Sequence, residues 1–231
     1  MTETLALALI LIPCLIVAIV FHEVSHGWAA LALGDPTAKE QRRLSLNPTR
    51  HVDPIGTLLV PGALALLGGP IFGWAKPVPV NRARLDNPRY GMMAVAAAGP
   101  ASNLLMALVA AVVLGIVVGV AHSTGSPLPE LAMTAFGYFL AINIFLALFN
   151  LLPIPPFDGS HIVEGLLPRR FAAQFNRLQQ IGILFIVVLV AITWAFPDSG
   201  VVENVVMPPV EWAQAQYIAL ADWVARVWVG E

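Results

Sequence analysis

The sequence predicts an all-α integral membrane protein, a polytopic helical bundle of about four to five spans with a re-entrant or β-hairpin segment after the first helix. Of its 231 residues, 58% are hydrophobic and only 11% are charged, whereas an ordinary soluble domain carries about 25% charged residues. The charges also leave five uncharged stretches, each of about 18 residues or more, which is long enough for a helix to cross a hydrocarbon core. They cover residues 4–21, 54–75, 90–129, 131–157 and 178–197.

The first stretch is expected to be a retained helix rather than a cleaved signal peptide. It carries Glu3 instead of a basic start, and it has no small-x-small cleavage site at the end of the apolar run, before the histidines that follow. Its Cys14 is the only cysteine of the chain. An intrachain disulfide is therefore impossible, and we do not expect a thiolate ligand for a metal.

The second stretch is expected to enter the membrane and return to the same side. Basic residues both precede and follow it, so a simple crossing would place one of these loops against the positive-inside tendency. The stretch is also rich in proline and glycine, which disfavour a continuous helix. The flanking basic residues are Lys39, Arg42, Arg43 and Arg50 before it, and Lys76, Arg82, Arg84 and Arg89 after it.

The remaining spans then alternate in direction. The first helix runs inward, residues 91–121 outward, 131–153 inward and 178–196 outward, so that the basic residues up to Arg177 share the cytoplasmic side. The loop at 122–130 has no Lys or Arg, as an outer loop should. We expect residues 1–200 to form one membrane-embedded domain. Residues 201–231 are expected to form a C-terminal amphipathic or interfacial helix.

A metal-binding motif follows the first apolar stretch. His22 and His26 enclose Glu23 in the pattern HExxH, and on a helix the two histidines present their imidazoles from one face. This pattern is typical of a zinc site with a carboxylate placed to activate water. Ionisable side chains in an apolar helix are costly and usually functional, so we predict a zinc centre near the cytoplasmic end of the first span.

The third ligand must come from elsewhere in the chain, and Asp158 is the best candidate. It follows an inward helix that three prolines stop, so it arrives on a stiff extended segment at about the depth of His22. Two downstream glutamates, Glu40 and Glu164, remain alternatives. Other candidates lack comparable framing: His51, Asp53 and His161 lie in loops on the same side, and His122 lies on the opposite face.

These motifs together resemble those of the site-2 protease family of intramembrane zinc metalloproteases. The resemblance covers residue 4 to about residue 165 and includes HEVSH at 22–26, GPASN at 99–103 and NLLPIPPFDG at 150–159. It implies that His22, His26 and Asp158 are zinc ligands and Glu23 the catalytic base, and it suggests that Asn103 and Asn150 orient substrate or stabilise the oxyanion. Many members carry PDZ or CBS modules; none fits here, so we expect a minimal member.

The predicted activity is hydrolysis of peptide bonds within or near transmembrane segments, with one Zn²⁺ per chain. We expect the protein to act on transmembrane protein substrates in a lipid bilayer and to bind no nucleic acid. The location implied is a prokaryotic cell membrane. A transmembrane helix must unwind before attack, and strand-like pieces at 56–60 and 76–80 are hypothesised to pair with it. Asn143 is interpreted as packing. The alternative function is a membrane metal-binding or helix-holding protein that does not cut.

Overall fold

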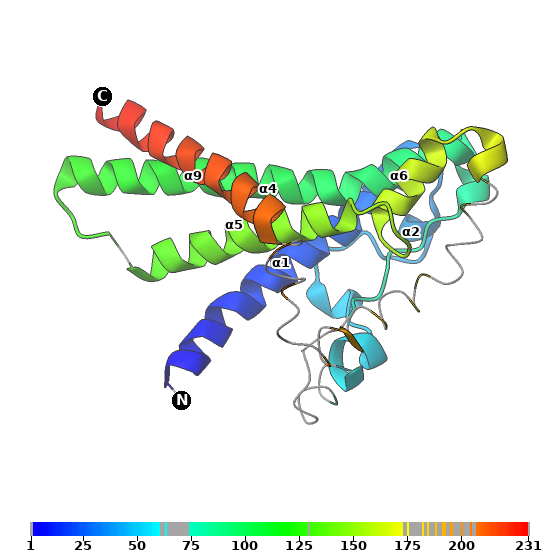
Figure 1. The fold of residues 1–231 in the computed structure, drawn as a ribbon, viewed down its shortest axis with the longest axis horizontal. Coiled ribbons are helices and arrows are strands. Elements are labelled where there is room, and N and C mark those ends of the chain that lie inside the picture. The colour runs from blue at the N-terminus through cyan, green and yellow to red at the C-terminus, as the bar shows by residue number, and fades with distance from the viewer. Residues whose placement is uncertain are drawn as a thin grey trace.

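The computed structural model describes residues 2–60, 74–128, 130–172 and 207–230, together with a few isolated positions outside these ranges. Its described part is helical, as the all-α class predicts, and it contains no strand (Figure 1). The elements are α1 (Thr2–Ala32), α2 (Thr37–Glu40), η1 (Pro48–Arg50), η2 (Pro54–Leu59), η3 (Arg82–Arg84), α4 (Pro88–Thr124), α5 (Glu130–Asn150), α6 (Asp158–Leu166) and α9 (Met207–Val229).

Three of the described helices, α1, α4 and α5, are long and apolar enough to cross a membrane. Each of the three packs against the other two, and α6 and α9 both pack against α4. The long α4 therefore lies at the centre of the bundle (Figure 1). The prediction of a polytopic helical membrane protein is confirmed. Most of the fourth predicted span, at 178–196, lies outside the described residues.

Helix α1 is longer than the uncharged stretch that predicted it. It continues through the HExxH motif to Ala32, because the residues after His26 are mainly Ala, Leu and Trp, which sustain a helix. The motif therefore lies inside a helix rather than at its end, which fixes the separation of His22 and His26 at one helical turn.

The strand-like interpretation of residues 56–60 is wrong. Pro54–Leu59 forms a short helix, because Asp53 Oδ1 accepts hydrogen bonds from the backbone N–H groups of Ile55 and Gly56 at 2.9 and 2.7 Å. With Pro54 at the first position, this N-cap favours a helical turn over a strand. Residues 74–80 form neither a helix nor a strand. Most of the predicted re-entrant segment between them lies outside the described residues.

Helix α9 packs closely on α4 through two glycines. A Cβ added at Gly115 would lie 2.4 Å from the Ala221 carbonyl oxygen, and one at Gly119 would lie 2.8 Å from Trp228 Cβ. Only glycine allows this approach at these positions. Within the C-terminal segment, Met207–Val229 forms the helix α9; that residues 201–231 form an amphipathic or interfacial helix stays a prediction.

Candidate metal centre

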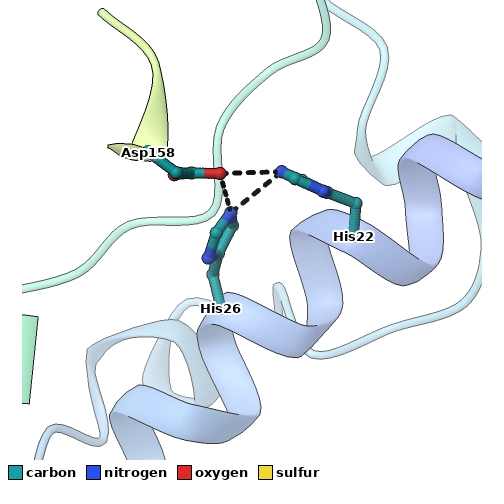
Figure 2. Close-up of side chains that lie close together, drawn as sticks. All are labelled: His22, His26 and Asp158. Carbon is teal, nitrogen blue, oxygen red and sulfur yellow. Dashed lines mark hydrogen bonds and ion pairs between the residues drawn. The ribbon is translucent and has the colours of Figure 1, made fainter. Parts of the chain in front are cut away.

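Helix α1 supplies two imidazoles from one face. His22 and His26 are 6% and 9% exposed, and their Nε2 atoms lie 3.1 Å apart. Their spacing of four residues places both rings over the same turn. Both side chains point away from the α1 axis toward a common point (Figure 2).

Asp158 meets the two histidines from the far end of the chain. Its Oδ2 atom lies 3.1 Å from His22 Nε2 and 3.4 Å from His26 Nε2 (Figure 2). Asp158 is the first residue of α6, and the residue before it, Phe157, is extended. The proline-rich segment after α5 therefore delivers this carboxylate to the level of the HExxH motif, as the sequence predicts.

The outer nitrogens of both imidazoles face hydrogen-bond acceptors. His26 Nδ1 lies 2.7 Å from the Val95 carbonyl oxygen, and His22 Nδ1 lies 2.6 Å from Asn103 Oδ1. In each neutral ring the proton therefore sits on Nδ1. Each Nε2 then turns a lone pair toward Asp158, which is the tautomer that a metal ligand requires.

The orientation of the Asn103 amide follows from its other contacts. Its Nδ2 donates to Asn143 Oδ1 at 2.8 Å and to the Ala18 carbonyl oxygen at 3.2 Å. Asn143 Nδ2 in turn donates to the Phe139 carbonyl oxygen, so Asn143 must present its oxygen to Asn103. Both asparagines are fully buried. Asn103 Oδ1 is thus left to accept from His22.

These three side chains fit a zinc ion. Two lone-pair nitrogens and a carboxylate oxygen face one another, and the buried Oδ2 of Asp158 has no hydrogen-bond donor among the described residues. Such a set is repulsive without a cation. Ligand atoms bound to tetrahedral zinc at about 2.0–2.1 Å lie about 3.3–3.4 Å apart, close to the 3.1–3.4 Å found here.

Asp158 would bind a cation through its ionised carboxylate. In the described part of the chain, no other group of three histidine, cysteine or acidic side chains converges in this way.

Gly99 allows α4 to lie directly against the two imidazoles. A Cβ there would be 2.5 Å from His26 Nε2 and Cε1 and 2.6 Å from His22 Cε1. Any larger residue would occupy the space around the ligand atoms. The GPASN sequence thus contributes both a gap, at Gly99, and an acceptor, at Asn103.

Glu23 lies outside the ligand set. Its Oε2 accepts a hydrogen bond from the backbone N–H of Val78 at 2.8 Å, so a segment that follows the second apolar stretch holds the motif's carboxylate. Asn150, at the end of α5, donates from Nδ2 to the Leu146 carbonyl oxygen. The structure records no contact of Asn150 with the three clustered side chains.

The competing third ligands have other partners. Glu164 is paired with Arg82 at 2.7 Å and Glu40 with Arg84 at 2.6 Å. Asp53 caps η2, and His51 Nε2 contacts the Ser45 carbonyl oxygen. His161 lies 3.6 Å from Glu164, and His122 is in the last turn of α4, far along that helix from Gly99.

Two contributors to the site were missed in the sequence: Asn143 and the Val95 carbonyl. A backbone carbonyl has no sequence signal. Asn143 does have one, because it is an amide in an otherwise apolar helix, predicted at a depth similar to that of Asn103 on a neighbouring helix. Pairing the two amides was possible from the sequence.

The comparisons with known proteins agree with this geometry. The model of Peptidase family M50 matches residues 114–193. "Putative zinc metalloprotease YwhC" of Bacillus subtilis (strain 168) is 38% identical over 200 residues, which cover 82% of this chain and 86% of that protein. The chain belongs to peptidase family M50, the site-2 protease family.

More distant relatives carry a similar description. "Putative zinc metalloprotease Rip2" of Mycolicibacterium smegmatis is 25% identical over 197 residues, 80% of this chain and 72% of that protein. Rip2 of Mycobacterium tuberculosis strain H37Rv is 26% identical over the same length. No solved structure matches. Its apolar helices and its family indicate a multi-pass membrane protein, and membership of M50 places it among membrane metalloproteases.

Proposed function

We propose that the protein is a zinc endopeptidase that cuts peptide bonds within or near transmembrane segments of other membrane proteins, in regulated intramembrane proteolysis. One observation carries the proposal: three ligand atoms converge at zinc-like spacing, two of them on a helix long and apolar enough to span a membrane, with Glu23 beside these two in the HExxH motif. A metal at this place reaches bonds that a soluble protease cannot reach.

We assign His22, His26 and Asp158 to one Zn²⁺ per chain. When bound, zinc polarises a carbonyl oxygen and lowers the pKa of water toward neutrality. The protein's part is to hold the ligands in position. Val95 and Asn103 fix the two imidazoles through Nδ1, and the prolines before α6 fix the carboxylate.

Glu23 is assigned as the general base. Its Oε2 is held by the Val78 N–H, so Oε1 is the oxygen to which we assign proton transfer. It takes a proton from the attacking water and returns it to the leaving amine, without a covalent acyl-enzyme. This mechanism needs no serine or cysteine nucleophile.

Asn103 and Asn150 have different assignments. Asn103 uses both amide hydrogens on Asn143 and Ala18, which favours orienting His22 over donating to an oxyanion. Asn150 donates one hydrogen to Leu146 and has a second. We therefore retain Asn150 as the side chain that orients substrate or stabilises the developing oxyanion.

The charges support a cytoplasmic location for the centre. The exposed basic residues Lys39, Arg42, Arg84 and Arg169 belong to α2, η3 and the segments around them and after α6. These elements lie at the end of the bundle that is opposite the N-terminus and the α4–α5 connection (Figure 1). The positive-inside tendency favours the cytoplasm for that end, and the bacterial relatives fit a cell membrane.

The test compares cleavage of a panel of single-span membrane proteins by purified wild type, Glu23→Gln and chelator-treated protein in detergent, with metal content measured for each. We expect cleavage by the wild type alone, and bound zinc in both wild type and Glu23→Gln. Cleavage that persists in Glu23→Gln contradicts the assigned mechanism. Binding of substrates without cleavage by any sample supports a helix-holding protein instead.

A further inference from the structure

Arg43 is a buried cation whose contacts are backbone carbonyls. It is 8% exposed, and its Nη2 donates to the carbonyl oxygens of Lys76 at 2.9 Å and Pro77 at 3.3 Å. In the part of the chain that the structure describes, no carboxylate lies within 4.0 Å of it. Burying a guanidinium is costly, so this arrangement calls for a reason beyond packing.

The carbonyls that Arg43 binds belong to residues 76–80, which we name the clamped segment; its prolines at 77 and 79 favour an extended backbone. Two further hydrogen bonds hold its ends. Lys76 N–H donates to the His51 carbonyl oxygen at 2.9 Å, and the next residue, Asn81, donates its N–H to Oδ2 of the fully buried Asp35 at 2.6 Å. The segment is therefore fixed at both ends against the loop that follows α1.

Between those ends the clamped segment contacts α1, the helix that carries Glu23, at Val78. The Val78 N–H donates to Glu23 Oε2 at 2.8 Å. Its side chain is 7% exposed and lies against Gly27, where an added Cβ would be 2.9 Å from Val78 Cγ1. Pro77 and Pro79 flank it. They have no N–H and fixed φ angles, so Val78 is the one N–H donor of this stiff tripeptide.

We infer that Arg43 is a positioning residue for the proposed reaction: it fixes the clamped segment so that the Val78 N–H orients the carboxylate of Glu23. The inference rests on the proposed function. Arg43 does not touch the reacting atoms. It holds the carbonyls of Lys76 and Pro77, which position Val78, and the Val78 N–H then holds Glu23. The rigidity of the prolines transmits the position of the carbonyls to the N–H between them.

The decisive experiment is a double-mutant cycle on kcat and KM with a cleaved substrate. Arg43→Gln removes the clamp, and Val78→Pro removes the N–H while keeping an extended backbone. Each is expected to lower kcat roughly 10- to 100-fold, the usual cost of a misplaced catalytic group, with KM and zinc content unchanged. Because both changes act through one hydrogen bond, the double variant should be no slower than Val78→Pro alone.

Two further variants complete the test. Arg43→Lys keeps a cation that can reach the carbonyls and should recover part of the lost kcat; it also replaces Arg43→Gln in the cycle if that variant does not fold. Lys39→Gln removes an exposed charge on α2, which precedes Arg43, and should match the wild type. Falls in kcat that multiply in the double variant, or a rise in KM in place of a fall in kcat, overturn the inference. A wild type that binds zinc and cuts no substrate overturns the proposed function and the inference with it.

Discussion

Asn103 Oδ1 lies 2.6 Å from His22 Nδ1, and this contact ties the metal centre to the packing of three helices. His22 is on α1, Asn103 is on α4, and Asn143, which holds the Asn103 amide, is on α5. The orientation of one ligand therefore depends on the correct assembly of all three spanning helices. A contact of this kind also selects the tautomer that leaves Nε2 free for a metal.

Asn103→Leu should weaken zinc binding. The substitution keeps the volume similar but removes the acceptor for His22 Nδ1–H, so the ring loses both its tautomer preference and its orientation. Loss of such an outer partner typically costs about 10- to 100-fold in metal affinity. The measurement is zinc retention in competition with a chelator, with helicity followed by circular dichroism.

Ser102→Ala is the matched control for Asn103→Leu. Ser102 is the neighbouring residue on α4, and its hydroxyl donates to the Gly99 carbonyl oxygen within the same helix. We expect this variant to retain zinc as the wild type does. Equal retention by Asn103→Leu would show that packing alone orients His22.

Asp158→Asn should reduce zinc affinity far more than Glu164→Gln. Asp158 Oδ2 lies within 3.4 Å of both imidazole nitrogens, and an amide is a poorer zinc ligand than a carboxylate. Glu164 is bound to Arg82 instead, so its substitution should disturb the docking of α6 without emptying the centre. Both variants are compared by their zinc content after dialysis against metal-free buffer. Zinc loss in Glu164→Gln alone would favour Glu164 over Asp158 as the third ligand.

Gly99→Ala should impair zinc binding although it adds one methyl group. The new Cβ would lie within 2.6 Å of both imidazole rings, and a clash of that size displaces a ring or the α4 backbone. The same change at Gly137, on α5, meets nothing within 4 Å and should add about 1 kcal/mol of helix stability. Chelator competition on the two variants separates a local clash from the general effect of Gly→Ala.

Much of the site could be predicted from residues whose geometry is local. The histidines of HExxH are one helical turn apart in any helix, and three prolines leave Asp158 on a stiff segment after a span of the right length. Both features depend on neighbours in the chain. The structure accordingly brings His22, His26 and Asp158 together.

Features that depend on long-range contacts could not be predicted. The sequence leaves the role of Asn103 ambiguous, because the backbone carbonyl of Ala18, which accepts one of its two amide hydrogens, has no signal in the sequence. The Val78–Glu23 hydrogen bond joins residues 55 positions apart through a backbone group that every sequence has. The error at residues 56–60 has a different cause: β-prone composition outweighed the N-cap signal of Asp53 followed by Pro54.

The α4–α9 contact makes a last prediction about stability. Gly115→Ala should destabilise the protein, because the added Cβ would lie 2.4 Å from the Ala221 carbonyl oxygen, and helix backbone cannot yield as a flexible side chain does. Overpacking of this kind typically costs about 1–3 kcal/mol, and each kcal/mol lowers Tm by about 2–4 °C in a chain of this size. Val113→Leu is the control, since it adds one carbon at an exposed position of the same helix and should leave Tm unchanged. The measurement is thermal unfolding in detergent with zinc present. An unchanged Tm for Gly115→Ala would mean that α9 contributes little to the fold, whereas the expected fall would make α9 part of the folded membrane domain.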